Sequence, residues 1–414
     1  RPFLQRLVRH AEVDIVAYER GSVDTQIADG IRSCRTVPIR PIRNTSTFYR
    51  LRTFFSPEDV QQRDAEMSAS LASILTEREY DIVWVSGWRM LLYLPEVREH
   101  AAAHTRIIAD VIDDEVRGNW QDFRDAKGLS ANATMGRRLL RNSLYQRRFL
   151  KHADLALFVA EADAATTKER MPKLRVAVNQ NGVDTDYFAP LGTEAQWERD
   201  DPVLLFEGTM SYAPNIEGSR YLVQKVLPLV QREIPNARVL LIGRDPTPEL
   251  EALAGPDVEL TGTVEDVRVH LRRGALLACS LRSGTGLKNK ILQSWAMGIP
   301  VVATPISVLG LGATQDQELL IAEGAEAFAA ECVRVLRSKD LRQRLGTSGR
   351  KLAMERYSLR VKLDEIDRYI AELRAGASDG PALLTHAENS CAAASADEAG
   401  HPEAGPKEPV RDVH

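Results

Sequence analysis

Cysteine is scarce in this sequence, and the few cysteines form no recognisable pattern. Cys34, Cys279, Cys332 and Cys391 are scattered, without a CxxC pair or a neighbouring histidine. This scatter argues against a zinc site and against a disulfide framework, and it fits a reducing cytoplasm. The sequence also has no apolar run near the roughly 18 residues that a membrane span requires. Its first residues lack the pattern of a signal peptide.

Excess charge and the common nucleotide-binding signatures are missing as well. The formal net charge is −4, which gives no electrostatic reason to expect a nucleic-acid partner. No GxGxxG motif follows the first predicted strand, and no GxxxxGK[ST] motif occurs. A dinucleotide-binding fingerprint and a P-loop are therefore both excluded.

The length and the order of the predicted elements indicate two domains. At 414 residues the chain is long enough for two hydrophobic cores. Strand-like runs alternate with helical segments in the first half; they cover residues 13–18, 81–86, 106–112 and 154–159. Such alternation predicts an α/β domain with a parallel sheet. Because residue 1 is an arginine and residues 2–10 already read as a helix that leads into the first strand, we expect upstream residues to be missing.

An acidic segment, Asp113-Asp114-Glu115, follows one of these strands at the sheet edge where a doubly wound domain binds its ligand. Three interpretations are open. One is a metal site, since hard cations prefer carboxylate oxygens. Another is a helix cap followed by a charge in the first turn. The third is that Asp113 or Asp114 faces the cleft and accepts a hydrogen bond from a substrate hydroxyl.

Residues 136–151 form a basic and amphipathic segment. Such a helix is typical of a contact with an anionic membrane surface. The alternative is a packed helix whose arginines face solvent or pair with acidic residues of this chain. A lipid-linked acceptor would favour the membrane contact.

The second half repeats a strand, a glycine-bearing loop and a helix. Strands predicted at residues 203–206, 239–242, 258–260 and 275–279 are followed by loops at Gly208, Gly243, Gly262 and Gly284/Gly286. We expect a second doubly wound domain in which these loops gather on one edge of the sheet. A nucleotide between two Rossmann-like domains is the natural ligand for such an edge.

The stretch 281–298 is the strongest candidate site. Its glycines allow the backbone to approach a ligand, and a short predicted helix begins at about Asn289. The start of that helix carries unpaired N–H groups and a partial positive charge, to which Lys288 and Lys290 add full charges. This arrangement suits a phosphate, although an ordinary turn between a strand and a helix explains the same residues.

Five motifs occur in order along the chain: residues 181–188 (NGVDTDYF), 206–215 (FEGTMSYAPN), 241–244 (LIGR), 261–267 (TGTVEDV) and the stretch 281–298. Together they resemble the GT-B glycosyltransferases of family 4, also called glycosyl transferases group 1, and within it the bacterial branch associated with surface polysaccharides. The resemblance covers nearly all of residues 1–373, and the second half is the more specific part. It implies an α/β protein of the GT-B fold, with two doubly wound Rossmann-like domains facing a central cleft.

The predicted domain boundaries follow this fold. An acceptor-side domain spans residues 1–190 and residues 191–201 form a linker. Residues 202–356 form the domain that binds the nucleotide sugar, and a helix over 357–375 crosses back to the first domain. Residues 376–414 are rich in Ala, Glu, Gly, Pro and Ser, and we expect a disordered tail there.

The resemblance implies a retaining transferase that moves a sugar from a nucleotide diphosphate to an acceptor in the cleft, without a metal or another cofactor. Lys288 and Lys290 would neutralise the leaving diphosphate, and Asp113 would contact the transferred sugar. The residues expected to bind the donor are Gly208, Thr209, Arg244, Gly284, Thr285, Gly286, Leu287, Asn289 and Gln293. Cations and N–H dipoles aimed at a departing diphosphate supply a large catalytic contribution.

The sequence departs from the family pattern around this loop. The family commonly has two glutamates separated by seven residues, the second of which grips the donor ribose. Gln293 stands at the second position, and Arg282 or Ser283 stands near the first. Because glutamine accepts through a neutral carbonyl, we expect weaker ribose binding. Thr209 and Met210 also replace the usual Arg and Lys after the first strand of the second domain.

These observations predict a cytoplasmic glycosyltransferase, and a peripheral contact of residues 136–151 with the inner face of the membrane stays open beside the packed helix. Its expected partners are a nucleotide sugar and a glycan, lipid-linked or small-molecule acceptor in surface or exopolysaccharide synthesis, with no nucleic acid. Two alternatives remain open. One is transfer to a small natural product, and the other is a catalytically degenerate GT-B subunit that binds and activates a partner, which Gln293 and the missing cations motivate.

Overall fold

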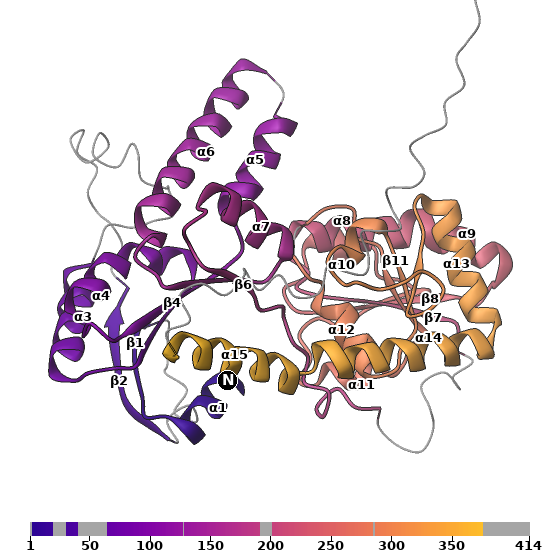
Figure 1. Cartoon of the computed structure of the whole chain (residues 1–414). Helices are drawn as coiled ribbons and strands as arrows, with labels where there is room; N and C mark the ends of the chain where they lie inside the picture. Colours follow the sequence, from indigo (N-terminus) through magenta and orange to yellow (C-terminus); the bar gives the residue numbers. More distant parts are fainter. Residues whose placement is uncertain are drawn as a thin grey trace, which may run out of the picture.

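The computed structural model describes residues 2–19, 30–39, 64–126, 128–190, 201–284 and 286–375, which form two α/β halves (Figure 1). The elements of the first half are α1 (Pro2–His10), β1 (Val13–Glu19), β2 (Ile31–Pro38), α3 (Ala65–Glu77), β3 (Ile82–Ser86), η2 (Trp88–Tyr93), α4 (Leu94–His100), β4 (Arg106–Ile112), α5 (Glu115–Asp125), α6 (Leu129–Leu150), β5 (Leu155–Phe158), α7 (Glu161–Arg170) and β6 (Val176–Val178). Those of the second half are β7 (Val203–Glu207), α8 (Ala213–Tyr221), η4 (Leu222–Val226), α9 (Leu227–Glu233), β8 (Arg238–Ile242), α10 (Pro248–Glu251), β9 (Val258–Leu260), α11 (Val267–Leu271), β10 (Leu276–Cys279), α12 (Asn289–Ala296), β11 (Val301–Ala303), η5 (Pro305–Val308), β12 (Leu320–Ile321), α13 (Ala325–Arg337), α14 (Lys339–Leu352), η6 (Ala353–Tyr357) and α15 (Leu359–Arg374).

The first half contains a parallel four-stranded sheet and a separate pair of strands. The sheet has the order β3-β4-β5-β6, and β1 pairs in parallel with β2. The sequence predicted one sheet that included residues 13–18. This prediction was wrong, because β1 pairs with β2, a strand that was not predicted. β2 alternates between exposed and half-buried residues along most of its length and carries two arginines and a serine, so it has no apolar run.

The second half is a single parallel sheet with the order β12-β11-β10-β7-β8-β9. From the middle of the sheet, β7, β8 and β9 follow one another toward one edge, and β10, β11 and β12 follow one another toward the opposite edge. The strand order therefore reverses between β7 and β10. Ligands of open α/β sheets bind at such a switch point, beyond the carboxyl ends of the strands. The loops that lead into α8 and α12 both start there.

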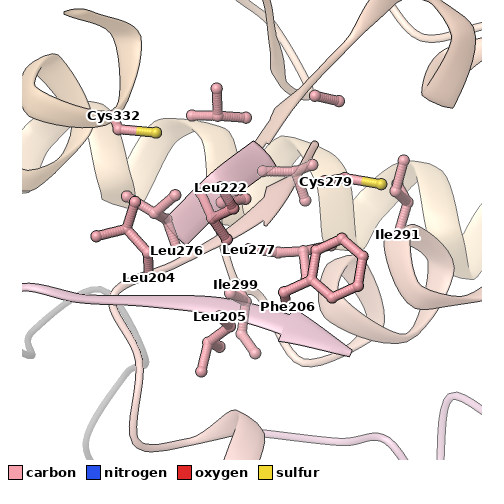
Figure 2. Close-up of a cluster of buried hydrophobic side chains, with 14 of the residues drawn as sticks. Leu204, Leu205, Phe206, Leu222, Leu276, Leu277, Cys279, Ile291, Ile299 and Cys332 are labelled. Atoms are coloured by element: carbon pink, nitrogen blue, oxygen red, sulfur yellow. The ribbon is translucent and has the colours of Figure 1, made fainter. Parts of the chain in front are cut away.

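The core of the second half explains why its strands read as continuous apolar runs. Leu204, Leu205 and Phe206 of β7 pack against Leu276 and Leu277 of β10, all without exposed surface (Figure 2). A parallel sheet with helices on both faces buries successive side chains on either side. Alternation between apolar and polar residues is therefore absent, and the strands were predictable from composition alone.

The last helix joins the two halves. α15 leaves the second half and runs beside the first (Figure 1), where Tyr369 and Leu373 pack against Ile108 and Leu155. The hydroxyl of Tyr369 donates to Val178 O over 2.8 Å. This placement agrees with a helix that crosses back to the first half, while the exact domain boundaries stay predictions. Residues 191–200 of the expected linker and the expected tail 376–414 lie outside the described residues.

Candidate functional site

The glycine loops that follow β7, β8 and β9 are bonded to one another. The N–H of Gly208 donates to Ile242 O over 2.9 Å, and the N–H of Gly243 donates to Thr261 Oγ1 over 3.3 Å. A Cβ added to Gly243 would lie 1.7 Å from Gly208 O. The loops thus touch through their backbones, and only glycine allows this contact.

The fourth glycine loop leads from β10 into α12. Gly284 and Gly286 have φ values of 103° and 74°, a region that favours glycine. Lys288 occupies the N-cap of α12 without a side-chain cap, and its Nζ donates to Gly284 O over 3.0 Å. The first N–H groups of α12 have no partner within the helix and lie at the positive end of its dipole. They suit an anionic ligand.

Lys290, in the first turn of α12, is buried and held by other side chains of the second half. Its Nζ donates to Asn215 Oδ1 over 2.8 Å and lies 4.1 Å from the centre of the Phe206 ring. Asn215 in turn donates to Thr209 O over 2.9 Å. Burial lowers the pKa of Lys290. The lysine therefore ties the loop after β7 to α12, a contact that the sequence did not indicate.

Two further side chains at this edge have buried oxygens that accept no hydrogen bond from any described residue. They are Oε2 of Glu207, the last residue of β7, and Oε1 of Gln293 in α12. Burial raises the pKa of the Glu207 carboxyl, and the charge of Lys290 opposes that rise. Glu207 was missed by sequence reasoning. Its only signal there was a charge at the end of an apolar strand.

The acidic segment after β4 divides into two roles. Ile112 has a φ of 75°, which is rare for a β-branched residue and turns the chain at the end of the strand. Asp114 is 3% exposed, accepts from the N–H of Val116 over 3.0 Å and pairs with Arg170. Asp114 is thus a buried helix cap. Of the two aspartates that the sequence offered for the cleft, the structure leaves Asp113.

Asp113 meets the second half at the loop before α12. Its Oδ1 lies 3.8 Å from the position that a Cβ would take on Gly286. Partial burial raises the pKa of the Asp113 carboxyl, Asp163 adds to the rise, and Lys288 opposes it. Burial also lowers the pKa of Lys288, while the charge of Asp113 acts against that. An acid of the first half and a lysine of the second half therefore influence each other's protonation.

A second contact between the halves lies beside this one. Asn181 Nδ2 donates to Asn289 Oδ1 over 3.1 Å, at the first residue of α12. Gln180 Nε2 donates to Gly310 O over 3.1 Å. The start of α12 is therefore positioned from both halves.

The remaining predicted site residues contribute less directly. Arg244 is exposed and pairs with Asp245 over 3.0 Å. The side chain of Leu287 packs in the core, which leaves its backbone for a ligand. Thr209 offers its carbonyl to Asn215, and Thr285 lies outside the described residues. Their roles in donor binding stay predictions.

Comparison with known families identifies the second half. Residues 201–338 match the family described as "Glycosyl transferases group 1". This segment is a glycosyl transferases group 1 domain. The match confirms the family resemblance and the prediction of a glycosyltransferase, while the surface-polysaccharide branch stays a prediction. A search of curated protein sequences gives no match.

Solved structures agree with the glycosyltransferase domain and extend the likeness to both halves. Anabaena HepE in complex with UDP and glucose is 12% identical, with a TM-score of 0.60 over 89% of this chain and 95% of that chain. Sucrose-phosphate synthase from Thermosynechococcus elongatus is 14% identical, with a TM-score of 0.60 over 88% of this chain and 100% of that chain. A UDP-forming trehalose-phosphate synthase from Burkholderia vietnamiensis is 14% identical, with a TM-score of 0.56 over 88% and 100%. Such low identities show the fold, and the predicted GT-B fold is confirmed.

The described residues contain no group of three or more His, Cys, Asp and Glu side chains arranged to hold a metal ion. Among the helices formed by these residues, none combines the length and the apolar character needed to cross a membrane.

Proposed function

We propose that this chain transfers a sugar from a nucleotide-diphosphate donor to a hydroxyl acceptor held between its two halves. The observation that carries the proposal is the meeting of Asp113 with Gly286 and Lys288 at the start of α12. The helix start and Lys288 suit the diphosphate. In this proposal, Asp113 accepts a hydrogen bond from a hydroxyl of the transferred sugar. Structures of HepE with UDP and with UDP-glucose support a nucleotide sugar as the donor.

In the proposed step, the bond between the anomeric carbon and the diphosphate oxygen breaks. The acceptor oxygen bonds to the same face of that carbon, so configuration is retained, and the acceptor proton leaves with the diphosphate. Lys288 and the N–H groups of α12 stabilise the charge on the leaving group. Holding the acceptor beside the donor lowers the barrier further. Retention and the absence of a resident cofactor are supported by the family resemblance.

α6 supports an acceptor located at a membrane. One side of this helix is packed, with Tyr145 buried, while Leu140 and Leu144 on the other side are 54% and 46% exposed. The helix contains no acidic residue, and Arg147 and Arg148 in its last turn are exposed. Basic side chains around exposed leucines suit an anionic lipid surface. The proposal therefore includes a glycan or lipid-linked acceptor of surface or exopolysaccharide synthesis, at the inner face of the membrane in the cytoplasm.

A second candidate function is a catalytically degenerate GT-B subunit that binds and activates a partner. Gln293 favours it, because the neutral carbonyl replaces the carboxylate that the family uses for the ribose. Absence of nucleotide binding together with absence of turnover would favour this function.

The test is turnover of a panel of UDP-, GDP- and ADP-sugars by the purified chain, with and without acceptor glycans. We expect one donor to be consumed, and Lys288→Ala to lower kcat/KM by about 100-fold because a fixed cation at the leaving group is lost. Lys225→Ala, at an exposed lysine of η4, is the matched control and should leave kcat/KM unchanged. NMR of the product gives its anomeric configuration. Neither binding nor turnover with any donor would overturn the proposal.

A further inference from the structure

Glu207 occupies an unusual position for an acid. The four residues before it in β7, Val203 to Phe206, are buried in the core of the second half. Glu207 lies opposite Ile242 in the neighbouring strand and directly precedes Gly208. It therefore stands at the carboxyl edge of the sheet, beside the point where the strand order reverses and a ligand is expected.

One oxygen of the Glu207 carboxylate, the buried Oε2, has no hydrogen-bond partner among the described residues. The nearest influence of opposite charge is Lys290, whose ammonium is bonded to Asn215 and stacked on Phe206 instead. Burying a carboxylate oxygen without a hydrogen bond is costly, so Oε2 of Glu207 is a candidate to accept a hydrogen bond from a ligand.

Gln293 of α12 also has a buried oxygen, Oε1, that lacks a hydrogen-bond donor among the described residues. Gln293 follows Lys290 by three residues, and this spacing puts both on one side of the helix. Two unpartnered acceptors, one charged and one neutral, thus belong to the neighbourhood of a single lysine. A ligand that satisfies both would offer two donors close together, and the vicinal diol of a ribose is such a pair.

We propose that Glu207 supplies the carboxylate that binds a ribose hydroxyl of the donor nucleotide, with Gln293 as its neutral companion. The inference rests on the proposed function and adds a residue to it. The acid that the family carries in α12 is then replaced by one from β7. The charge-assisted hydrogen bond that Gln293 cannot make is made by Glu207.

The experiment measures binding of UDP, GDP and ADP, each beside its 2′-deoxy and 3′-deoxy counterpart, by calorimetry on the purified chain. For the nucleotide that binds, we expect loss of the hydroxyl that faces Glu207 to weaken binding by about 10- to 100-fold, the range for a hydrogen bond to a charged group. Glu207→Gln should weaken binding of the ribonucleotide similarly and reduce its advantage over that deoxy form to about 3-fold or less, because only a neutral acceptor remains. The loss of discrimination between the ribonucleotide and its deoxy form is the decisive result. Removing a carboxylate with a merely structural role would weaken binding of both nucleotides equally.

A second variant tests the exchange of roles. In the Glu207→Gln background, Gln293→Glu returns a carboxylate from α12 and should restore at least part of the discrimination. The control is Glu233→Gln at the carboxyl end of α9, where Glu233 pairs on the surface with Arg337. It should bind both nucleotides as the unchanged chain does. Melting temperatures with and without nucleotide show that each variant folds.

The outcomes separate this inference from the proposed function. If the unchanged chain binds a ribonucleotide and Glu207→Gln keeps the full preference over both deoxy forms, Glu207 is a counter-ion of Lys290 and the inference is wrong while the proposed function stands. If the unchanged chain binds none of the nucleotides and turns over no donor, the proposed function falls, and the inference falls with it.

Discussion

At the scale of single residues, the environment sets the protonation of the two side chains that meet between the halves. Partial burial raises the pKa of Asp113 from its ordinary value of 3.8, and burial lowers the pKa of Lys288 from its ordinary value of 10.5. Asp113 accepts a hydrogen bond best as a carboxylate, and Lys288 neutralises a diphosphate only as an ammonium. Both shifts therefore narrow the pH range in which the site has its working charges.

We expect a bell-shaped dependence of kcat/KM on pH. The rate should fall on the acid side as Asp113 takes up a proton, at a higher pH than for an ordinary aspartate. It should fall on the alkaline side as Lys288 loses its proton, at a lower pH than for an ordinary lysine. Lys288→Arg should move the alkaline limb upward, because a guanidinium stays protonated. Steady-state rates across the stable pH range measure both limbs.

Asp113→Asn is the companion variant. It should remove the acid limb and lower the rate, since an amide does not titrate. Asp163→Asn provides a comparison, because Asp163 contributes to the raised pKa of Asp113 only through its charge. Removing that charge should move the acid limb to lower pH without removing it. Acid limbs that coincide in the unchanged chain and in Asp113→Asn would show that another group controls the profile.

At the scale of elements, α12 is held from behind by α14. Trp295 of α12 is fully buried, and its Nε1 donates to Glu318 O over 3.0 Å. A Cβ added to Gly349 of α14 would lie 2.4 Å from Trp295 Cδ1. The absence of a side chain at Gly349 therefore sets how closely the two helices pack, and with it the position of the helix start that is proposed to bind the diphosphate.

Gly349→Ala should displace Trp295 and α12. We expect the free energy of unfolding to fall by about 1–3 kcal/mol through overpacking, partly offset by the better helix propensity of alanine. Nucleotide affinity should fall with it. Denaturant unfolding and calorimetry give the two quantities.

The matched control is the same substitution in open space. Apart from its chain neighbours and the backbone of its own helix, Gly118 of α5 has no atom within 4 Å of an added Cβ. Gly118→Ala should therefore stabilise the chain by up to about 1 kcal/mol and leave nucleotide affinity unchanged. Equal effects of the two substitutions would contradict the packing argument.

At the scale of the whole molecule, α15 connects the two halves, and the pair α5–α6 extends from the first half. α15 ties the second half to the first through Tyr369 and Leu373. α5 and α6 project from the four-stranded sheet of the first half (Figure 1). The exposed leucines and arginines of α6 thus lie on an extension of the first half.

We expect the full chain to float with vesicles that contain phosphatidylglycerol and to bind vesicles of phosphatidylcholine more weakly. Arg147→Glu combined with Arg148→Glu should lower binding to the anionic vesicles by at least about 10-fold, since each basic residue near such a surface contributes about 1 kcal/mol. Leu144→Asp should weaken binding to both kinds of vesicle.

The control makes the same change of net charge elsewhere. Lys225→Glu with Arg232→Glu alters two exposed basic residues of the second half. Binding should persist there if α6 makes the contact. An equal loss in both double variants would show a general effect of net charge, and the membrane contact of α6 would be rejected.

Much of the fold could be predicted because its pattern is local. The buried strands of the second half read as apolar runs, and the confirmed family resemblance rests on loops that directly follow them. β2 could not be found, since its burial depends on one neighbouring strand and its own residues are mostly polar. The start of α12 was placed correctly at Asn289, because glycines before it and an apolar face after it mark a helix boundary.

The sequence by itself determined two α/β halves and the family of the second half. It also predicted the loop before α12 as the candidate site. Only the tertiary structure decided between neighbouring acids and between neighbouring lysines. Asp114 turned inward because Arg170, 56 residues away, pairs with it. Lys290 turned inward because Asn215, 75 residues away, accepts its hydrogen bond. Partners so distant in the chain leave no local pattern. For the same reason, only the tertiary structure shows that Oε2 of Glu207 has no hydrogen-bond partner among the described residues.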